Sequence, residues 1–418
     1  MVHPASYKST KTADLSLAGL LDPNILANPY PLYDELRTSD PVHWDPYLHA
    51  WVVTRYADVV TVLHGCSAIR SPTPEQLTEL GMSELNPIAN VLVRQMLFRD
   101  PPAHTRLRSL AAAAFTPGRV EAMREHIREI TDSLIDAFIS TGHMDVIADF
   151  ANLLPATVTC ELMGVPTADR HRLKAWSTDF SEMLGNFQHN PGRAARMLDV
   201  VESMTSYFRN AIAEQKDHPT TGVVRALLEA EVDGDRLTEE EIIANSIITM
   251  VGGQETTTNL IGNGLLTLLR HPEEFAELRA DLSALPSAVE ELLRYESPIQ
   301  QTARVAPDGF LLAGKPIRPK QAVISVLGAA NRDPVRFPEP ERLDLRRQDN
   351  RHLAFGSAAH YCFGAPLARV EAQIAFSAII RRLPNLALAS TGLVWRRNTT
   401  FRGLESLPVT FDASSARS

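Results

Sequence analysis

The sequence has only three cysteines, Cys66, Cys160 and Cys362, in 418 residues. They lie far apart and form no C-x-x-C pair, which excludes a disulfide framework and a cysteine-rich zinc site. Any cysteine that takes part in chemistry here must therefore act alone.

Long apolar runs and an excess of basic charge are also missing. No run approaches the roughly 18 apolar residues of a membrane helix, and residues 1–21 never build the apolar segment of a secretory signal. The 41 Lys and Arg are outnumbered by 50 Asp and Glu, and the formal charge of −9 argues against binding to nucleic-acid phosphates. We therefore expect a soluble, cytoplasmic protein that binds neither membrane nor nucleic acid.

Amphipathic stretches follow one another from residue 100 to residue 298, with Pro and Gly breaks between them. The fold is therefore predicted to be mainly α. One helix is expected to take its N-cap and a proline in its first turn from Asp100-Pro101-Pro102, and to run to Phe115. Further helices are predicted at 119–141, 146–163, 168–186, 193–216, 220–231 and 286–295.

The longest predicted helix begins after Thr238, whose hydroxyl can form a capping box with Glu241, and ends near His271. Residues 239–270, at about 1.5 Å rise each, span roughly 48 Å, which is enough to cross a domain of this size. We therefore expect a long central helix.

The predicted β-structure is small and draws on both ends of the chain. This interleaving favours a single domain over residues 1–418, in which residues 1–20 form a flexible N-terminal segment. Strands are predicted at 52–53, 301–306, 309–312, 322–327 and 407–411.

The most informative window is residues 355–369, a glycine-containing loop that leads into an amphipathic helix. Cys362 comes just before this helix, where the helix dipole and free N–H groups are expected to lower the thiol pKa, as suits a metal ligand. Gly364 permits close approach of the backbone to the sulfur, and His360 can direct a donor at an anionic group beside the metal. Without further motifs, a buried structural cysteine remains an alternative.

This window resembles the haem-binding loop of the cytochrome P450 family. It departs from the family pattern at Ala358, where a glycine is usual, so we expect a slightly different backbone turn but retained haem binding. The residues that fall on the family spacing are Phe355, Gly356, His360, Cys362 and Gly364.

A second motif is Glu291-Leu-Leu-Arg294, whose two charged residues can pair on one helix face. Many helices carry such a pair by chance. The position of this one some 70 residues before Cys362, followed by the segment 337–342, resembles the P450 family. That resemblance implies that Glu291, Arg294 and Arg342 together lock the region around the haem loop, which is a structural role.

The central helix contains two adjacent glycines, Gly252 and Gly253, each of which costs on the order of 1 kcal/mol relative to alanine. Thr256 can donate a hydrogen bond back to the carbonyl of Gly252 and open a groove for a small ligand. Close packing of another element is the alternative. With the cysteine loop, the segment resembles the oxygen-activating acid–alcohol pair of the family, which implies catalytic roles for Glu255, Thr256 and Gly252.

His104 and Arg108 lie four residues apart and project from one helix face. Exposed polar residues would look the same. The surrounding run resembles the helix that binds the haem propionates in bacterial members, and the resemblance adds Arg304 and His360 as further propionate partners. Buried carboxylates require such charge-assisted partners.

The resemblance, which covers nearly the whole chain, implies a cytochrome P450 fold with the long central helix over haem b (iron protoporphyrin IX), ligated by the Cys362 thiolate. The implied activity is insertion of one oxygen atom of O2 into a medium-sized, mainly apolar organic substrate, as in hydroxylation or epoxidation during natural-product tailoring. Electrons are expected from ferredoxin and ferredoxin reductase. The alternatives are a peroxide-driven peroxygenase, which typically lacks the acid–alcohol pair, and a haem sensor or carrier.

By the same resemblance, several segments are expected to line the substrate pocket, and basic residues near Cys362 are expected to attract an acidic ferredoxin. The pocket segments are 71–98, 179–197, 245–252, 299–303 and 399–401, and the basic residues are Arg106, Arg119, Arg351 and Arg369.

Overall fold

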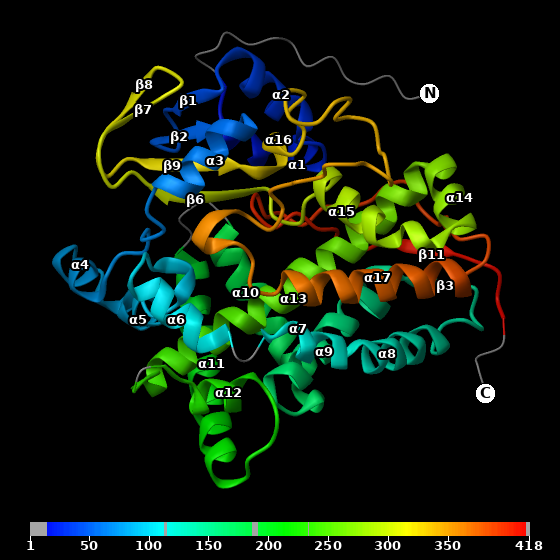
Figure 1. The fold of residues 1–418 in the computed structure, drawn as a ribbon, viewed down its shortest axis with the longest axis horizontal. Coiled ribbons are helices and arrows are strands. Elements are labelled where there is room, and N and C mark those ends of the chain that lie inside the picture. The colour runs from blue at the N-terminus through cyan, green and yellow to red at the C-terminus, as the bar shows by residue number, and fades with distance from the viewer. Residues whose placement is uncertain (1–14, 113–114, 186–190, 233, 415–418) are drawn as a thin grey trace.

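The computed structural model describes residues 15–112, 115–185, 191–232 and 234–414. As predicted, the molecule consists mainly of α-helices with small β-sheets (Figure 1). The largest sheet lies at one end of the molecule, and a smaller second sheet lies among the helices.

The first part of the chain combines short helices with a strand pair. Its elements are a 3₁₀ helix at Leu17–Leu21, α1 (Pro23–Ala27), α2 (Tyr30–Ser39), β1 (Val42–Asp45), β2 (Ala50–Val53), α3 (Tyr56–Gly65), α4 (Pro74–Glu79), a 3₁₀ helix at Ser83–Leu85, α5 (Asn86–Leu92) and a 3₁₀ helix at Met96–Phe98.

The middle of the chain forms the helical body. Its elements are α6 (Ala103–Ala112), α7 (Pro117–Ala122), α8 (Arg124–Asp136), β3 (His143–Asp145), a π-helical segment at Val146–Ala151, α9 (Leu153–Met163), a 3₁₀ helix at Thr167–Asp169, α10 (Arg170–Gly185), α11 (Pro191–Asp217), α12 (Val223–Glu229), β4 (Glu231–Val232), β5 (Asp235–Arg236) and α13 (Glu239–Arg270).

The last part returns to the sheets before the final long helix. Its elements are α14 (Pro272–Ala280), a 3₁₀ helix at Leu282–Ala284, α15 (Leu285–Tyr295), β6 (Gln301–Val305), β7 (Phe310–Leu312), β8 (Lys315–Ile317), β9 (Ala322–Val326), α16 (Leu327–Ala330), a 3₁₀ helix at Ala358–His360, α17 (Ala365–Arg382), β10 (Ala387–Leu388) and β11 (Pro408–Thr410).

The largest sheet joins residues 42–53 with residues 301–326, in the strand order β1-β2-β9-β6. β2 runs parallel to β9, with Val52 opposite Ile324, and β6 runs antiparallel to β9, with Ala303 opposite the same Ile324. A second sheet has the order β10-β11-β3. Strands from distant parts of the sequence therefore interleave, as the sequence predicts.

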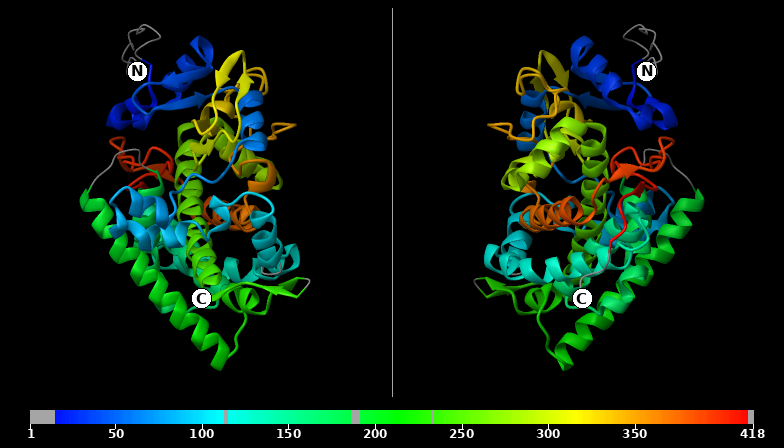
Figure 2. Two further views of the ribbon diagram at one scale, coloured as in Figure 1. Left: turned by 90° about the vertical axis from the view of Figure 1, so that its left-hand side faces the viewer. Right: turned by 90° about the vertical axis from the view of Figure 1, so that its right-hand side faces the viewer.

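The long helix α13 has the predicted bounds because its N-terminal cap forms as expected. The hydroxyl of Thr238 accepts a hydrogen bond from the backbone N–H of Glu241 at 3.2 Å, and the Glu241 carboxylate accepts one from the N–H of Thr238 at 2.9 Å. The helix runs through the middle of the molecule (Figure 2) and is mostly buried along its length.

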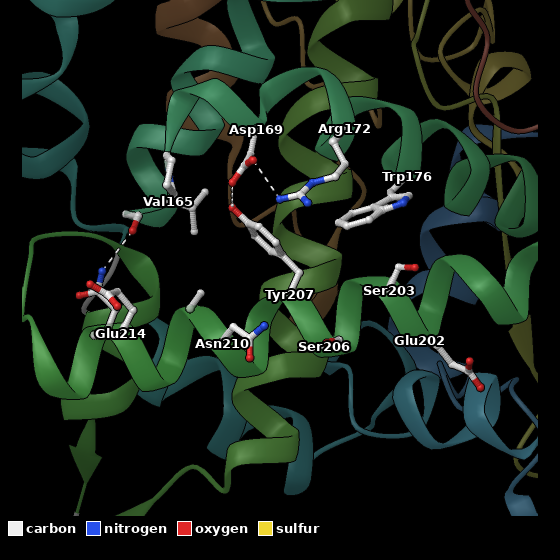
Figure 3. A pocket seen from close by; sticks show the side chains of 14 residues that line it. Val165, Asp169, Arg172, Trp176, Glu202, Ser203, Ser206, Tyr207, Asn210 and Glu214 are labelled. Carbon is white, nitrogen blue, oxygen red and sulfur yellow. Dashed lines mark hydrogen bonds and ion pairs between the residues drawn. The ribbon is translucent and has the colours of Figure 1, made fainter.

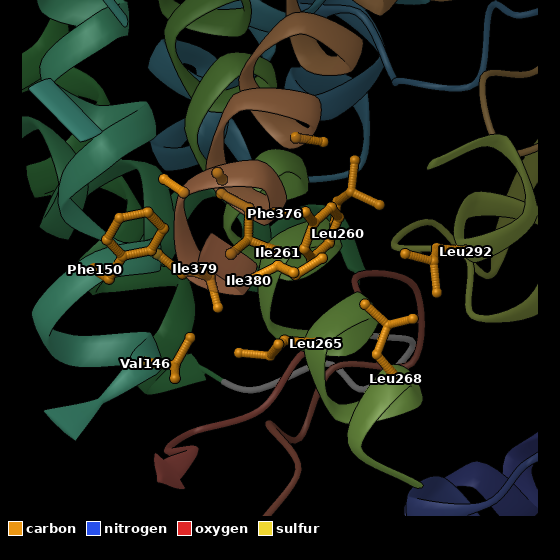
Figure 4. Packing of buried hydrophobic residues seen from close by; sticks show 14 of the residues in the cluster. Val146, Phe150, Leu260, Ile261, Leu265, Leu268, Leu292, Phe376, Ile379 and Ile380 are labelled. Carbon is orange, nitrogen blue, oxygen red and sulfur yellow. The ribbon is translucent and has the colours of Figure 1, made fainter. Parts of the chain in front are cut away.

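The main core lies where α13 crosses α17. Leu260, Ile261 and Leu265 of α13 pack with Phe376 and Ile379 of α17 (Figure 4). The two backbones approach closely at Gly264, where an added Cβ would lie 2.6 Å from the ring of Phe376. This crossing fixes α17, and with it the loop that precedes α17, against the central helix.

Some predicted helix boundaries are wrong. α6 begins at Ala103, after the two prolines, because the side chain of Asp100 is engaged elsewhere: it accepts hydrogen bonds from Ser67 Oγ at 2.5 Å and from the N–H of Ala68 at 2.8 Å. α6 ends at Ala112, and the predicted end at Phe115 lies beyond residues 113–114, which are outside the described residues. The predicted helix 119–141 is divided at Met123 into α7 and α8.

The N-terminal prediction also needs correction where the structure describes it. Residues 1–14 lie outside the described residues, but Leu15, Leu17 and Leu20 are buried against β2 and β9, so residues 15–20 are packed rather than flexible.

One segment, Val146–Met163, is long and apolar enough to cross a membrane by length and composition, and 61% of it is buried inside the protein. Most of this segment is therefore packed in the protein core.

Candidate functional site

The loop before α17 brings the backbone back on itself around Cys362. The N–H of Cys362 donates a hydrogen bond to the carbonyl of Phe355 at 2.8 Å, and α17 begins at Ala365. Gly356 has a φ of 71°. Ala358, at the position where the family usually has glycine, adopts a φ of 58°, in the left-handed region that costs an alanine roughly 1–2 kcal/mol. The loop therefore retains a turn that favours glycine.

The predicted lowering of the Cys362 pKa is wrong for the free thiol. Burial raises the pKa of the Cys362 thiol, and this effect outweighs the N–H groups of Gly364 and Ala365, which lower it. The helix N-terminus therefore acts in the expected direction but is the weaker effect. A metal cation would favour the thiolate by displacing the proton from the sulfur.

The structure brings together the four residues that were predicted to bind propionates. The rings of His104 and His360 lie 4.2 Å apart, and Arg108 donates a hydrogen bond from Nη1 to the carbonyl of Ala359 at 3.2 Å. Burial lowers the pKa of His360 to about 4, and the positive charge of Arg304 lowers it further in the same direction. These residues come from α6, β6 and the cysteine loop, so only the tertiary fold places them side by side.

This cluster contains donors that lack acceptors. Among the residues that the structure describes, neither Nε of the buried Arg304 nor Nε2 of His360 has a hydrogen-bond partner. Buried polar atoms of this kind are rare because their desolvation is not compensated. The two carboxylates of haem b would supply the missing acceptors, and Cys362 would supply a thiolate ligand to its iron, so the residues present fit this cofactor.

The two adjacent glycines of α13, Gly252 and Gly253, serve different purposes. Thr256 Oγ1 donates to the carbonyl of Gly252 at 2.7 Å, as predicted. Apart from the neighbouring residues and the backbone of the same helix, no described atom lies within 4 Å of the position that a Cβ on Gly252 would take. At Gly253, by contrast, an added Cβ would lie 2.9 Å from Oγ1 of Thr159 on α9. Gly253 therefore permits close packing, whereas Gly252 and Thr256 border open space.

The carboxylate of Glu255 is fully buried and is held by cations that the sequence did not indicate. Arg396 Nη1 lies 2.5 Å from it, Thr178 Oγ1 donates to it at 2.7 Å, and Lys174 Nζ also pairs with it. Burial alone would raise the pKa of Glu255, but the charges of Lys174 and Arg396 outweigh burial and hold the pKa at about 2. Glu255 is therefore ionised at neutral pH.

The predicted group of charged residues around Glu291 forms, but one of its predicted members is replaced by another arginine. Arg294 and Glu291 are both buried and make two hydrogen bonds, at 2.7 and 2.8 Å. The second arginine is Arg347, whose Nε lies 3.1 Å from the Glu291 carboxylate, so the prediction of Arg342 is wrong. The backbone carbonyl of Arg342 accepts hydrogen bonds from Arg294 and Arg347, while its side chain is exposed and lies 3.5 Å from Glu339.

A groove of about 760 Å³ lies between α10 and α11 (Figure 3). Tyr207 donates to the Asp169 carboxylate at 2.9 Å, and Arg172 lies over the rings of both Tyr207 and Trp176. None of the predicted catalytic or cofactor-binding residues lines this groove. It is therefore separate from the site formed by Cys362 and Thr256.

Comparison with known proteins agrees with this arrangement. The sequence model of the cytochrome P450 family matches residues 82–386. The chain is similar to the biotin biosynthesis cytochrome P450 of Bacillus subtilis (strain 168), with 39% identity over 390 residues that cover 93% of this chain and 97% of that protein. It is also similar to the cytochrome P450 monooxygenase PikC of Streptomyces venezuelae, with 39% identity over 401 residues that cover 94% of this chain and 93% of that protein.

A solved structure shows the same fold. The crystal structure of P450BioI in complex with hexadec-9Z-enoic acid ligated acyl carrier protein has a TM-score of 0.88 and 38% sequence identity, and the match covers 93% of this chain and 99% of that one. The predicted fold class is therefore confirmed, and the chain belongs to the cytochrome P450 family and is one of its monooxygenases.

Proposed function

We propose that this monooxygenase uses haem b, ligated by the Cys362 thiolate, to insert one oxygen atom of O2 into a medium-sized, mainly apolar organic substrate. The observation that carries the proposal is the cluster of buried His104 and Arg304 with half-buried His360, which comes two residues before Cys362. Nε of Arg304 and Nε2 of His360 have no hydrogen-bond partner among the described residues. Phe363, next to the cysteine, packs against the apolar cluster that includes Val251 of α13. The cysteine loop and the glycine-containing part of α13 therefore border one region.

When bound, the haem supplies the oxygen chemistry, and its thiolate ligand favours O–O cleavage. The protein holds the cofactor by its carboxylates through His104, Arg108, Arg304 and His360. Phe355 and Gly364 shape the loop on either side of the sulfur: the Phe355 carbonyl accepts from the N–H of Cys362, and the N–H of Gly364 points to the thiol.

Proton delivery is assigned to Glu255 and Thr256, with Gly252 leaving room beside them. The Thr256 hydroxyl, fixed by its bond to the Gly252 carbonyl, can hold a water molecule in the open space at that point. Glu255 is ionised and doubly paired, so it can accept a proton only when Lys174 or Arg396 withdraws from it. Opening of this ion pair is therefore part of the proposed proton route.

Several of the segments expected to line the substrate pocket are neighbours in the fold. Asn245 of α13 accepts a hydrogen bond from the N–H of Met96 at 2.9 Å, which joins segment 245–252 to segment 71–98. Gln301 donates to the carbonyl of Thr399 at 3.2 Å, which joins 299–303 to 399–401. Residues 186–190 of the segment 179–197 lie outside the described residues. Relatives named for biotin and polyketide biosynthesis support a tailoring role in natural-product synthesis.

Electron delivery by ferredoxin and its reductase remains part of the proposal, and the cytoplasm is its proposed location. The expected basic patch is weaker than its composition indicates, because three of its four arginines are paired with carboxylates: Arg106 with Asp235 and Glu241, Arg351 with Asp349, and Arg369 with Glu290. We therefore expect only a modest slowing of reduction by an acidic ferredoxin as salt concentration rises.

The experiment that tests the proposed function is turnover of the purified protein after a spectral screen. Medium-sized apolar compounds are screened for a shift of the haem spin state, and each hit is incubated either with ferredoxin, reductase and nicotinamide cofactor or with hydrogen peroxide alone. We expect a product that contains one oxygen atom from O2 in the first mixture. A product in the peroxide mixture alone would support a peroxygenase, and a spin shift without any product would support a haem sensor or carrier.

A further inference from the structure

Arg70 lies at the start of the loop that precedes α4, beside the proposed propionate site. Ser67 and Val305 exchange backbone hydrogen bonds at 2.8 and 2.9 Å, which places this part of the chain against the end of β6, next to Arg304. The N–H of Ala68 donates to the Asp100 carboxylate at 2.8 Å, which ties the same part of the chain to the start of α6. These contacts place Arg70 near the propionate site, although no short-range sequence pattern connects Arg70 with the residues of that site.

The guanidinium of Arg70 joins the two ends of a long loop. Its Nη1 donates to the carbonyl of Ala68 at 3.0 Å and to the carbonyl of Leu97 at 3.3 Å. Its central carbon lies 4.4 Å from the centre of the Phe98 ring, within the range of a cation–π contact. These contacts close the loop formed by residues 71–97, which contains α4 and α5 and one of the segments expected to line the substrate pocket.

The charges around Arg70 are not balanced by the protein. Burial lowers the pKa of Arg70 to about 9, and the positive charge of Arg304 acts in the same direction. Asp100, the acid that raises the pKa of Arg304, already accepts hydrogen bonds from Ser67 and Ala68. Within the described part of the chain, Nε and Nη2 of Arg70 have no acceptor, and Arg304 Nε also has none. The half-buried Arg70 and the buried Arg304 are close enough for their positive charges to repel, so an anion that both contact would stabilise them.

We propose that Arg70 is a further positioning residue of the haem site: it donates hydrogen bonds from its free nitrogens to a haem propionate and, through its contacts with Ala68, Leu97 and Phe98, holds the loop 71–97 closed over the cofactor. Haem binding and ordering of this loop are then coupled. The inference rests on the proposed haem site, and it extends that site by linking the cofactor carboxylates to a wall of the substrate pocket.

The test compares Arg70→Gln, Arg70→Lys and the control Arg94→Gln in the haem-loaded protein. Arg94 lies on the same loop, but its side chain donates only to Asn90, at 2.7 and 3.1 Å, among the described residues. Loss of one charge-assisted hydrogen bond to a buried carboxylate should speed haem transfer to apomyoglobin on the order of tenfold in Arg70→Gln. Arg70→Lys should retain part of the effect, and Arg94→Gln should behave as the parent.

Two further readouts separate a bond to the propionate from a merely structural role. The midpoint potential of the iron should fall in Arg70→Gln, because a nearby positive charge is lost, and should be restored towards the parent value in Arg70→Lys. Amide hydrogen exchange in residues 71–97 should become faster in Arg70→Gln, and in the parent it should become faster when haem is removed.

The outcomes are distinguishable from failure of the haem site itself. A parent protein that binds no haem with a thiolate spectrum would overturn the proposed function. A parent with that spectrum, combined with an Arg70→Gln variant of unchanged haem transfer rate and potential, would overturn only the role of Arg70. If Arg70→Gln retains haem as the parent does but binds myristate more weakly, Arg70 contacts a substrate carboxylate instead. Unchanged amide hydrogen exchange in residues 71–97 of Arg70→Gln would overturn the closure of the loop.

Discussion

Lys174 of α10 pairs with the fully buried carboxylate of Glu255 on α13. We expect Lys174→Met to lower the free energy of unfolding by about 3 kcal/mol, the lower end of the range for a broken buried pair, because Arg396 still faces the carboxylate. The pKa of Glu255 lies at about 2, below its ordinary value, so its pairing stabilises the protein at neutral pH and is lost as the pH falls. In the variant this loss should begin at a higher pH.

Denaturant unfolding between pH 3 and pH 7 measures both effects. The control is Lys216→Met, because Lys216 makes an exposed ion pair with Glu239 at 3.2 Å and should change stability by no more than about 0.5 kcal/mol. Equal stabilities of the two variants would contradict the importance of the Lys174–Glu255 pair.

Thr256→Ala removes the hydroxyl that donates to the Gly252 carbonyl and that should hold water in the open space beside it. Electrons should still flow, but the product formed per reducing equivalent should fall several-fold and released peroxide should rise. The substrate-induced spin shift should remain as in the parent. Product and peroxide measured in one assay check this expectation.

Thr267→Ala is the matched control, because Thr267 makes the same kind of bond to the Asn263 carbonyl, at 2.8 Å, farther along α13. If both variants remain fully coupled, the Thr256 hydroxyl has only a packing role and protons reach the site by another route.

Cys362→Ser should abolish the thiolate signature, because a serine hydroxyl is a poor ligand that remains mostly protonated. The reduced carbon monoxide complex should lose its red-shifted Soret band. Cys66→Ser and Cys160→Ser should retain the band, since Cys66 follows α3 and Cys160 lies within α9, so neither belongs to the loop before α17. Loss of the band in either of these variants, with retention in Cys362→Ser, would show that the ligand is wrongly assigned.

Ala358→Gly should stabilise the protein. The left-handed backbone at φ 58° costs an alanine roughly 1–2 kcal/mol, whereas the added freedom of the unfolded chain costs a glycine about 0.4–1 kcal/mol, so a net gain of about 0.5–1 kcal/mol is expected. Ala359→Gly, at the next residue, where φ is negative, should destabilise the protein. Thermal unfolding of the two haem-loaded variants checks the sign, and a destabilised Ala358→Gly would contradict the strain assigned to this turn.

Glu371 of α17 is a buried carboxylic acid, and burial raises its pKa to about 8. An acid with a raised pKa in the folded state stabilises that state at low pH, so the free energy of unfolding should fall as the pH rises from 4.5 through 8. Glu371→Gln should remove this dependence and stabilise the protein above pH 8 by on the order of a few kcal/mol.

Unfolding measured across this pH range tests the prediction, with Glu277→Gln, at an exposed position on α14, as the control. A parent and a Glu371→Gln variant with the same pH slope would show that the buried carboxyl gains a partner that keeps it charged.

The sequence alone determined the features that depend on neighbouring residues. The bounds of α13 follow from Thr238 and Glu241, three residues apart, and the Thr256–Gly252 bond follows from the i to i−4 geometry of a helix. The cysteine loop and its following helix were also predictable, because a P450-like motif occupies a continuous window. Such patterns determine local hydrogen bonds because these bonds depend on residues close in the sequence and not on how the rest of the chain packs.

The tertiary structure decided which charges meet. Lys174 and Arg396 lie 81 and 141 residues from Glu255, and no spacing rule connects them to it, yet they set its ionisation. Arg347 instead of Arg342 completes the lock on Glu291, because the loop turns the Arg342 carbonyl inward and its side chain outward. Burial likewise reversed the expected pKa shift of Cys362. Desolvation and long-range pairing depend on which surfaces become buried together, and only the packed fold determines that.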